Sequence, residues 1–175
     1  MYILKIISAA ALSLLVLAAV LVATGQLGWL AGQRPTDLGA RDGRLKAPSA
    51  TPNAVSSQAA DAARRIAPLR YRGDGAQAFA RLRELLARWP GAIIVSEAPG
   101  YLHAEFSTRW LRFVDDVEFL LDAGAGVIHV RSASRLGYSD FGTNRRRVEA
   151  IRQGFDHCPR GRDRRAAAGL GWPME

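Results

Sequence analysis

The stretch "VEFLLDAGAGVIHVRS", residues 117–132, consists of two alternating runs around a glycine-rich centre. Val117, Phe119 and Leu121 share one side of the first run, and Ile128 and Val130 share one side of the second. Such alternation is typical of strands with one face on a core. The "DAGAG" between them supplies the glycines that a tight turn needs. The stretch therefore predicts an antiparallel β-hairpin, and the rest of the fold is placed around it.

Two further strand-like runs precede this hairpin. The run "AIIVSE", residues 92–97, is short and apolar. The run "YLHAEFS", residues 101–107, alternates, with Leu102, Ala104 and Phe106 on one side. Together with the hairpin, these runs predict an antiparallel sheet of about four strands.

Two amphipathic segments flank the four strands. The first, "DGAQAFARLRELLARWPG" at residues 74–91, opens with Asp74 and Gln77 in a capping box and ends at Pro-Gly. The second, "NRRRVEAIRQG" at residues 144–154, follows Gly142-Thr143 and predicts a helix whose buried stripe is Val148, Ile151 and Phe155. The order helix, four strands, helix predicts an α+β two-layer sandwich with two main helices.

An uncharged apolar run begins at Ile6 and ends at Ala23. A run of that length can cross a bilayer as one helix. A cleaved signal peptide is the alternative, but the small residues expected at −3 and −1 are a poor match, because Leu21 lies two residues before Ala23. Residues 1–31 are therefore predicted to be a single transmembrane anchor or an uncleaved signal, with the lipid bilayer as partner.

The chain is strongly basic, with a net charge of +8 and a pI near 10.7. Such a balance is typical of proteins that bind nucleic acid or an anionic membrane surface. The apolar run favours the membrane surface, and no nucleic-acid partner is predicted. Cys158 is the only cysteine, which excludes an intrachain disulfide.

The polar side of the predicted sheet carries His103, Glu105, Glu118 and His129. Two histidines and two glutamates can bind a divalent metal. They lack the tight spacing of a ligand set, however, and a solvated face with cross-strand ion pairs is the favoured interpretation. No metal and no other cofactor is predicted.

The motif "RSASRLGYSDFGTNRRR", residues 131–147, contains most of the candidate site. Three arginines at residues 145–147 occupy the first turn of the second helix, where the helix dipole disfavours cations. Arg131 and Arg135 leave the last strand near the same place. Compensating acids are therefore expected nearby, namely Asp115, Asp116 and Asp140.

Two interpretations of this motif are open. In the first, arginines and aspartates form a structural network in which serine and asparagine side chains satisfy backbone groups. In the second, helix-start N–H groups and guanidinium groups form a pocket for a phosphate or carboxylate. No catalytic residue is assigned, since "GYSDFG" has its second glycine one residue too late for a nucleophile elbow. The candidate residues are Asp115, Asp116, Arg131, Ser132, Ser134, Arg135, Tyr138, Asp140, Asn144 and Arg145.

Several motifs carry a family resemblance: "LGARDGRL", "PNAVSSQA", "YLHAEF", "FVDDVEFLLD" and "VIHVRSASRLGYSDFGTNRRRVEAIR". Together they resemble the bacterial and plastid family catalogued as domain of unknown function fourteen-ninety-nine, over residues 38–153. The resemblance implies a membrane-anchored or exported protein and implies no particular activity. It also implies that residues 38–57 belong to the domain. Cysteines of many relatives correspond to Ser49 and Ala54, so their disulfide is not expected here.

With that boundary, residues 32–37 are predicted as a linker, 38–155 as the α+β domain and 156–175 as a disordered basic tail. The positive-inside rule does not orient the anchor, since Lys5 precedes it while Arg34 and Arg41 follow it. The resemblance implies a single-pass protein of the bacterial cytoplasmic membrane with a periplasmic domain.

Two functional hypotheses follow. The first is a non-enzymatic envelope module that binds a protein partner or an anionic ligand. The second is an envelope enzyme acting on a phosphate- or carboxylate-bearing substrate, with Asp140 as its acid or base.

Overall fold

The computed structural model describes residues 2–23, 30–109 and 111–157. In chain order the elements are α1 (Tyr2–Ala23), β1 (Ala54–Ser56), β2 (Leu69–Arg70), α2 (Gly75–Ala87), β3 (Ala92–Ala98), β4 (Tyr101–Ser107), β5 (Val114–Asp122), β6 (Val127–Ser134) and α3 (Thr143–His157).

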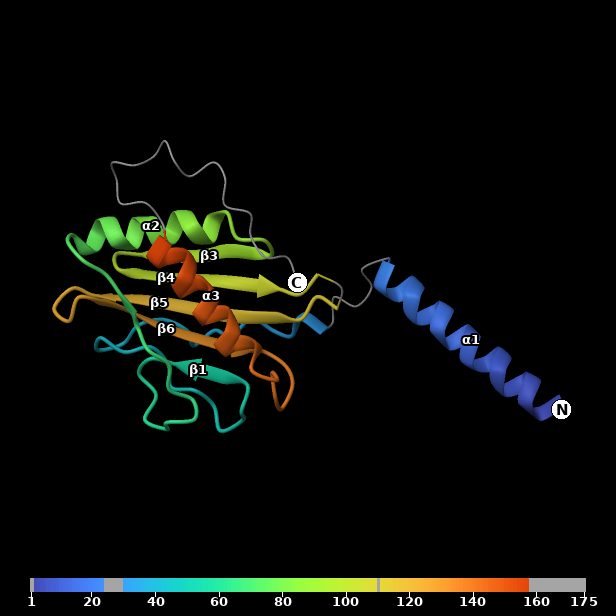
Figure 1. Ribbon diagram of the computed structural model, residues 1–175. Helices are drawn as coiled ribbons and strands as arrows, with labels where there is room; N and C mark the ends of the chain where they lie inside the picture. The colour runs from blue at the N-terminus through green and yellow to red at the C-terminus, as the bar shows by residue number, and fades with distance from the viewer. Residues whose placement is uncertain (1, 24–29, 110, 158–175) are drawn as a thin grey trace.

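One antiparallel sheet runs through the domain in the order β1-β6-β5-β4-β3, and β2 also pairs with β6 (Figure 1). The strands from β3 to β6 are the four that the sequence predicts, β3 from its short apolar run and the others from alternation. In the β5–β6 hairpin, Leu121 pairs with Ile128 and Phe119 pairs with Val130, as the opening stretch requires. The sheet exceeds the predicted four strands because the short β1 and β2 both pair with the outer side of β6.

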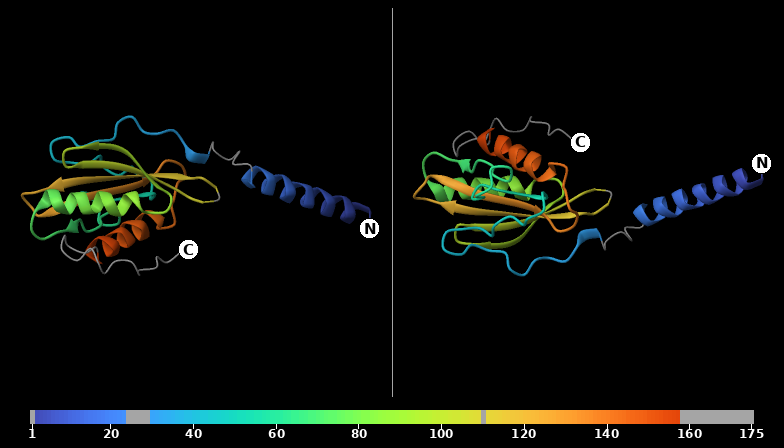
Figure 2. Two further views of the ribbon diagram at one scale, coloured as in Figure 1. Left: turned by 90° about the horizontal axis from the view of Figure 1, so that it is seen from above. Right: turned by 90° about the horizontal axis from the view of Figure 1, so that it is seen from below.

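Both α2 and α3 pack on the same face of this sheet (Figure 2). The α2 helix begins as predicted, because Asp74 Oδ1 accepts a hydrogen bond of 2.7 Å from the Gln77 amide. Trp89 meets Phe106 edge to face at 6.4 Å. The largest fully buried apolar side chains of this core are Leu69, Leu82, Leu86, Leu102, Val117, Phe119, Ile128, Val130, Val148 and Ile151. The α+β class is confirmed.

The opposite face of the sheet is covered by residues 30–47, which we call the strap (Figure 2). Arg34 pairs with Glu105 of β4, and the Gly39 amide donates to Glu118 of β5 at 2.9 Å. The residues predicted as a linker, 32–37, therefore lie on the domain. They are held there by the ion pair between Arg34 and Glu105, a charged side chain of the sheet.

The α1 helix has 22 residues and is about 33 Å long. Its segment Tyr2–Leu21 has a mean hydropathy of 2.5 and is not buried by the domain. By length and composition, α1 can cross a membrane. At the other end, α3 continues to His157, so Asp156 and His157 are helical where the tail was expected to begin. The remainder of the predicted tail, 158–175, lies outside the described residues.

Candidate functional site

The arginine-rich motif 131–147 spans the end of β6, the loop 135–142 and the start of α3. Consecutive residues of a strand point to opposite faces of a sheet. Arg131 therefore points toward the strap, whereas Ser132 and Ser134 point toward the helices. The motif consequently contributes to two separate polar networks, one on each face.

The first is the strap-face network, formed by Tyr101, His103, Glu105, Asp116, Glu118, Arg131 and Arg135. Arg135 donates from Nε and Nη2 to the two carboxylate oxygens of Asp116, each at 2.8 Å. The same Nη2 also bonds to Glu105. His103 Nε2 lies 2.8 Å from Asp116 Oδ1. One guanidinium thus joins acids from two neighbouring strands in a forked arrangement.

Glu118 is the second centre of the strap-face network, and its side chain is fully buried. Its Oε1 accepts from the Tyr101 hydroxyl at 2.8 Å and from the Gly39 amide at 2.9 Å. Its Oε2 accepts from Arg131 Nη1 at 3.0 Å. Burial, followed by the charge of Glu118, raises the pKa of Tyr101 far above its usual range, so the hydroxyl keeps its proton.

The expectation of a solvated polar face is wrong. His103 is 4% exposed and Glu118 is 0% exposed, because the strap lies over this side of the sheet. The expected cross-strand ion pairs are present, as Glu118 with Arg131 shows. The polar side of the sheet, which alternation had identified, is therefore a second buried layer that lies under the strap.

Two carboxylates of this layer, Asp116 and Glu105, keep their charge. Burial raises the pKa of Asp116, but hydrogen bonds from Arg135 and His103 outweigh that effect and hold it below its usual range. The pKa of Glu105 is likewise lowered, because bonds from Arg34 and Arg135 outweigh burial. The hydrogen bond to Asp116 raises the pKa of Arg135, so the guanidinium stays protonated.

The second is the helix-face network, centred on the buried side chain of Asn144. Its Nδ2 donates to the Asn53 carbonyl and to Ser134 Oγ, both at 2.9 Å. Its Oδ1 accepts from Arg147 Nη1 at 2.7 Å and from Ser132 Oγ. All four hydrogen-bonding positions of the amide are used. The start of α3 is thereby fixed to β6 and to the segment before β1.

Asp115 belongs to this helix-face network, away from Asp116. Its carboxylate pairs with Arg147 of α3, whose guanidinium carbon lies 5.1 Å from the centre of the Phe106 ring. The two aspartates predicted as one acidic group therefore lie on opposite faces. The pleat of β5 separates them because they are adjacent in the strand.

Asp140 is used at the start of α3. Its Oδ1 accepts from the Gly142 amide at 3.0 Å, and its Oδ2 accepts from the Asn144 amide at 2.7 Å. Burial raises its pKa, but the backbone bonds from Asn144 and Gly142 lower it further, so the carboxylate stays ionised. Both oxygens thus satisfy N–H groups at the start of the helix. Within the described part of the chain, Arg131 pairs with Glu118, and Arg135 pairs with Glu105 and Asp116, instead of with Asp140.

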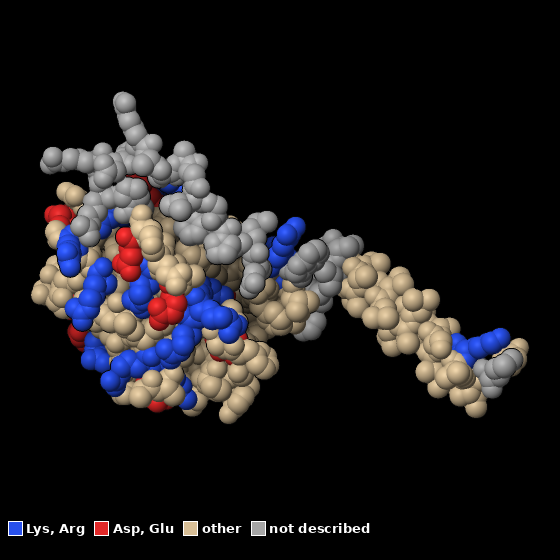
Figure 3. All heavy atoms as spheres, in the orientation of Figure 1, with Lys and Arg blue, Asp and Glu red and all other residues tan. Residues whose placement is uncertain are grey.

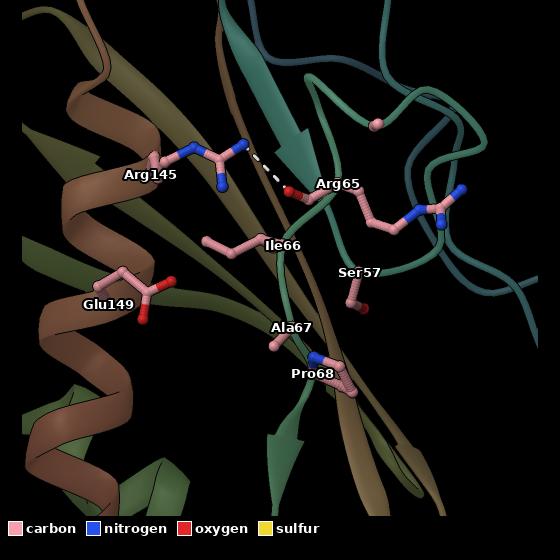
Figure 4. Close-up of a pocket in the computed structure, with 8 residues that line it drawn as sticks. Ser57, Arg65, Ile66, Ala67, Pro68, Arg145 and Glu149 are labelled. Atoms are coloured by element: carbon pink, nitrogen blue, oxygen red, sulfur yellow. Dashed lines mark hydrogen bonds between the residues drawn. The ribbon is translucent and has the colours of Figure 1, made fainter.

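Arg145 borders an open cleft of about 500 Å³ between α3 and the loop before β2 (Figure 4). Its Nη2 donates to the carbonyls of Ala63 and Arg65 at 2.8 and 3.0 Å. Glu149, on the same wall, pairs with Arg152. Positive side chains gather on the face of the domain that α3 covers (Figure 3). The cleft therefore combines a basic rim with side chains that also hold the loop to α3.

Tyr138 belongs to neither network, although it was predicted as a candidate site residue. It is 75% exposed on the loop 135–142, and Phe141 on the same loop is 86% exposed. The loop is held from beneath by Asn53 Nδ2, which donates to the Gly137 carbonyl at 2.8 Å. Arg146 Nη1 holds the Phe141 carbonyl at 2.9 Å. The aromatic side chains are thus exposed on a well-supported loop.

A third polar chain lies at the β1 edge and has no signal in the sequence. Ser57 Oγ lies 3.2 Å from His129 Nδ1, and His129 Nε2 lies 3.6 Å from Asp122. The second distance is too long for a hydrogen bond. Ser57 Oγ also accepts from the Val130 amide at 3.0 Å. The serine therefore has a structural role in joining this edge to β6.

No group of three or more histidine, cysteine, aspartate or glutamate side chains is placed to hold a metal ion within residues 2–23, 30–109 and 111–157.

The fold and these networks define a class: an α+β domain with one antiparallel sheet, two helices on one face and an apolar helix before it. Residues 44–155 match the family described as protein of unknown function (DUF1499), and the chain belongs to this family. The curated proteins and the solved structures contain no match to it.

Proposed function

We propose that this chain is a single-pass protein of the bacterial cytoplasmic membrane, whose domain lies on the periplasmic side and acts as a non-enzymatic interaction module. The observation that carries the anchoring is α1, whose segment Tyr2–Leu21 has a mean hydropathy of 2.5 and is not covered by the domain. A helix of this kind is stable in water only if something else buries its side chains. A bilayer supplies that environment along its whole length.

The two polar networks support a non-enzymatic role. Catalytic acids and bases need contact with a substrate. In this domain Asp115, Asp116 and Glu118 are buried, and each is paired with an arginine of the same domain. The charges therefore stabilise the packing of the strap and of α3.

Removal of residues 1–30 tests the anchoring. The truncated chain should leave the membrane fraction after cell lysis and keep a folded domain, because the core begins downstream of the deletion. The full chain should resist extraction with alkaline carbonate. A truncated chain that still pellets with membranes, yet is folded by circular dichroism, would contradict α1 as the anchor.

Cys158 provides a test of the proposed side of the membrane, since it is the only cysteine. A membrane-impermeant maleimide should label it in intact spheroplasts when the domain is periplasmic. The matched control is the same reaction after lysis, together with a Cys158→Ser variant that should not react. Labelling only after lysis would place the domain in the cytoplasm.

The enzyme hypothesis requires Asp140 to act as acid or base. Both of its oxygens accept hydrogen bonds from backbone amides at the start of α3, those of Gly142 and Asn144, and its pKa is lowered. The structure therefore favours the interaction module. A thermal-shift screen with phosphate- and carboxylate-bearing compounds tests the anion pocket, and Arg145→Ala at the cleft is its matched variant. A compound that raises the melting temperature of the parent but not that of Arg145→Ala would support an anion site at the cleft.

A further inference from the structure

The exposed apolar side chains of the domain gather at one end. Among the described residues outside α1, the large hydrophobic side chains that are exposed are Ile93, Leu111, Leu136, Tyr138 and Phe141. Tyr138 and Phe141 are the most exposed of them, at 75% and 86%. Single exposed apolar residues are common on protein surfaces, but a group at one place indicates an interaction site.

Strand register explains why these residues are neighbours. Asp115 of β5 pairs with Ser134 of β6, so the β4–β5 loop and the loop 135–142 leave the sheet at the same end. Ala92 of β3 pairs with Phe106 of β4, which brings the start of β3 to that end as well. Figure 1 shows these connections together at one end of the sheet.

The chain from α1 reaches the domain at this same end. Gly32 packs against the loop 135–142 so closely that a Cβ on it would lie 2.9 Å from Arg135 Cβ and 3.0 Å from Leu136 Cγ. Nine peptide units separate Gly32 from the last residue of α1, Ala23, so that distance is at most about 30 Å. The exposed apolar end is thus held close to the C-terminal end of α1.

The charges at this end suit an anionic lipid surface. Arg109 and Arg112 are exposed on the β4–β5 loop, and Arg146 is exposed beside Phe141. The acid of the loop 135–142, Asp140, is used at the start of α3. Arginine beside aromatic and aliphatic side chains is the composition of surfaces that lie in the headgroup region, where arginine contacts phosphate and tyrosine places its ring at the interface.

The backbone of both loops adopts an uncommon conformation. Phe141 has φ 51° and Arg112 has φ 56°, in the left-handed region that bulky residues seldom adopt. Asp140 and Arg146 hold the first of these turns by hydrogen bonds to its backbone. Residues kept in such conformations are concentrated at functional sites. An exposed phenylalanine that needs this support has no evident role in packing the domain.

We propose that this end of the domain, which we call the docking end, inserts into the interface of an anionic bilayer beside α1. Leu111, Tyr138 and Phe141 would enter the headgroup region, while Arg112 and Arg146 contact lipid phosphates. The inference rests on the proposed membrane anchoring and adds an orientation to it: the domain lies against the bilayer by its loops, with the β5–β6 turn at the far end of the sheet pointing away.

The test uses the full chain, reconstituted into vesicles of phosphatidylglycerol and phosphatidylcholine. A nitroxide is attached at Phe141→Cys in a Cys158→Ser background, and the matched control is Ala123→Cys, exposed in the β5–β6 turn. Power saturation then compares collisions with oxygen, which partitions into lipid, and with a water-soluble nickel complex. The label at 141 should show a several-fold higher oxygen-to-nickel ratio than the label at 123.

Flotation of the vesicles separates failure of the anchor from failure of the docking end. If the chain floats but the oxygen-to-nickel ratios at 141 and 123 are equal, only the docking end is overturned. That result would point to a protein partner for these side chains instead. A chain that does not float overturns both proposals. Tyr138→Cys gives a second labelled position, so a disturbed turn at 141 does not decide the outcome. Arg112→Glu should lower the oxygen-to-nickel ratio of the label at 141 and of the label at 138.

Discussion

Arg135 binds Asp116 through two parallel hydrogen bonds of 2.8 Å, from Nε to Oδ2 and from Nη2 to Oδ1. Both side chains are almost completely removed from water. A pair of this kind is costly to desolvate and is stable only when its geometry and its other hydrogen bonds are satisfied. His103 and Glu105 complete that set on the acid and on the guanidinium. Loss of any one of these four side chains therefore removes a partner from a buried charged group of the strap-face network.

Replacement of Arg135 by alanine should lower the free energy of unfolding by about 3–5 kcal/mol, because it leaves buried carboxylates without a counter-charge. Urea unfolding of the detergent-solubilised chain, followed by tryptophan fluorescence, measures this loss. Arg135→Lys should lose less, since it keeps the charge but not the fork. Arg83→Ala is the control, because Arg83 and Glu97 form a solvent-exposed ion pair whose loss should hardly change the free energy of unfolding. A neutral Arg135→Ala would contradict a structural network.

The network should also make the domain sensitive to acid. Asp116 and Glu105 have pKa values below their ordinary 3.8 and 4.5 in the folded state. Stability from these groups is therefore present above those ordinary values and is lost as the pH falls through the lowered ones. The free energy of unfolding should fall between about pH 5 and pH 2.

Asp116→Asn is the variant that tests this origin of the acid sensitivity. It should unfold more easily at neutral pH and show a shallower loss on acidification, as measured by urea midpoints across the pH series. Glu84→Gln, an exposed substitution on α2, should follow the parent profile. Equal slopes for Asp116→Asn and the parent would rule out Asp116 as a source of the acid response.

Asn144→Ala should loosen the junction between β6 and α3. It removes the partner of the Asn53 carbonyl and of two serine hydroxyls, and each buried group left unsatisfied costs about 1–3 kcal/mol. The same denaturation measurement applies. Hydrogen exchange should also speed up at the first turn of α3 while the far end of the β5–β6 hairpin stays protected. Uniform exchange across the domain would mean that Asn144 has no local role.

Gly32→Ala should release part of the strap. The new methyl group would meet Arg135 Cβ at 2.9 Å, at a residue whose φ is already +68°. The matched control is Gly43→Ala, where φ is +71° and nothing lies within 4 Å of the added atom. Both variants carry the same backbone strain, so the difference between them isolates the steric clash. Exchange of the Gly39 amide, which donates to Glu118, should be faster in Gly32→Ala than in Gly43→Ala.

Local sequence patterns predicted the elements that local interactions stabilise. Asp74 caps α2 three residues ahead of its partner, and alternation over residues 101–107 places the apolar side of β4 correctly. The short strands β1 and β2 carry no such signal. They are three and two residues long and depend on pairing with β6, more than fifty residues away. A segment of that length has too few residues for a period to be recognised.

The candidate site was harder to predict, for a different physical reason. Alternation correctly placed His103 and Glu118 on the side of the sheet away from the apolar core, but it does not show what covers that side. The cover is a non-periodic strap whose contact from Arg34 to Glu105 joins residues 71 positions apart. By contrast, the separation of Asp115 from Asp116 follows from the pleat alone. The sequence alone would therefore have been enough to predict that these two aspartates lie on opposite faces.

The strap also decides how the domain responds to a pull on α1. Tension that enters at residue 30 meets the packing of Gly32, then the pair from Arg34 to Glu105, then the bond from Gly39 to Glu118. These contacts lie one after another along the chain, so they would be loaded and broken one at a time. The chain would lengthen before any load reached β1 and the hydrophobic core. The strap would therefore detach first and protect the folded core from a pull on the helix.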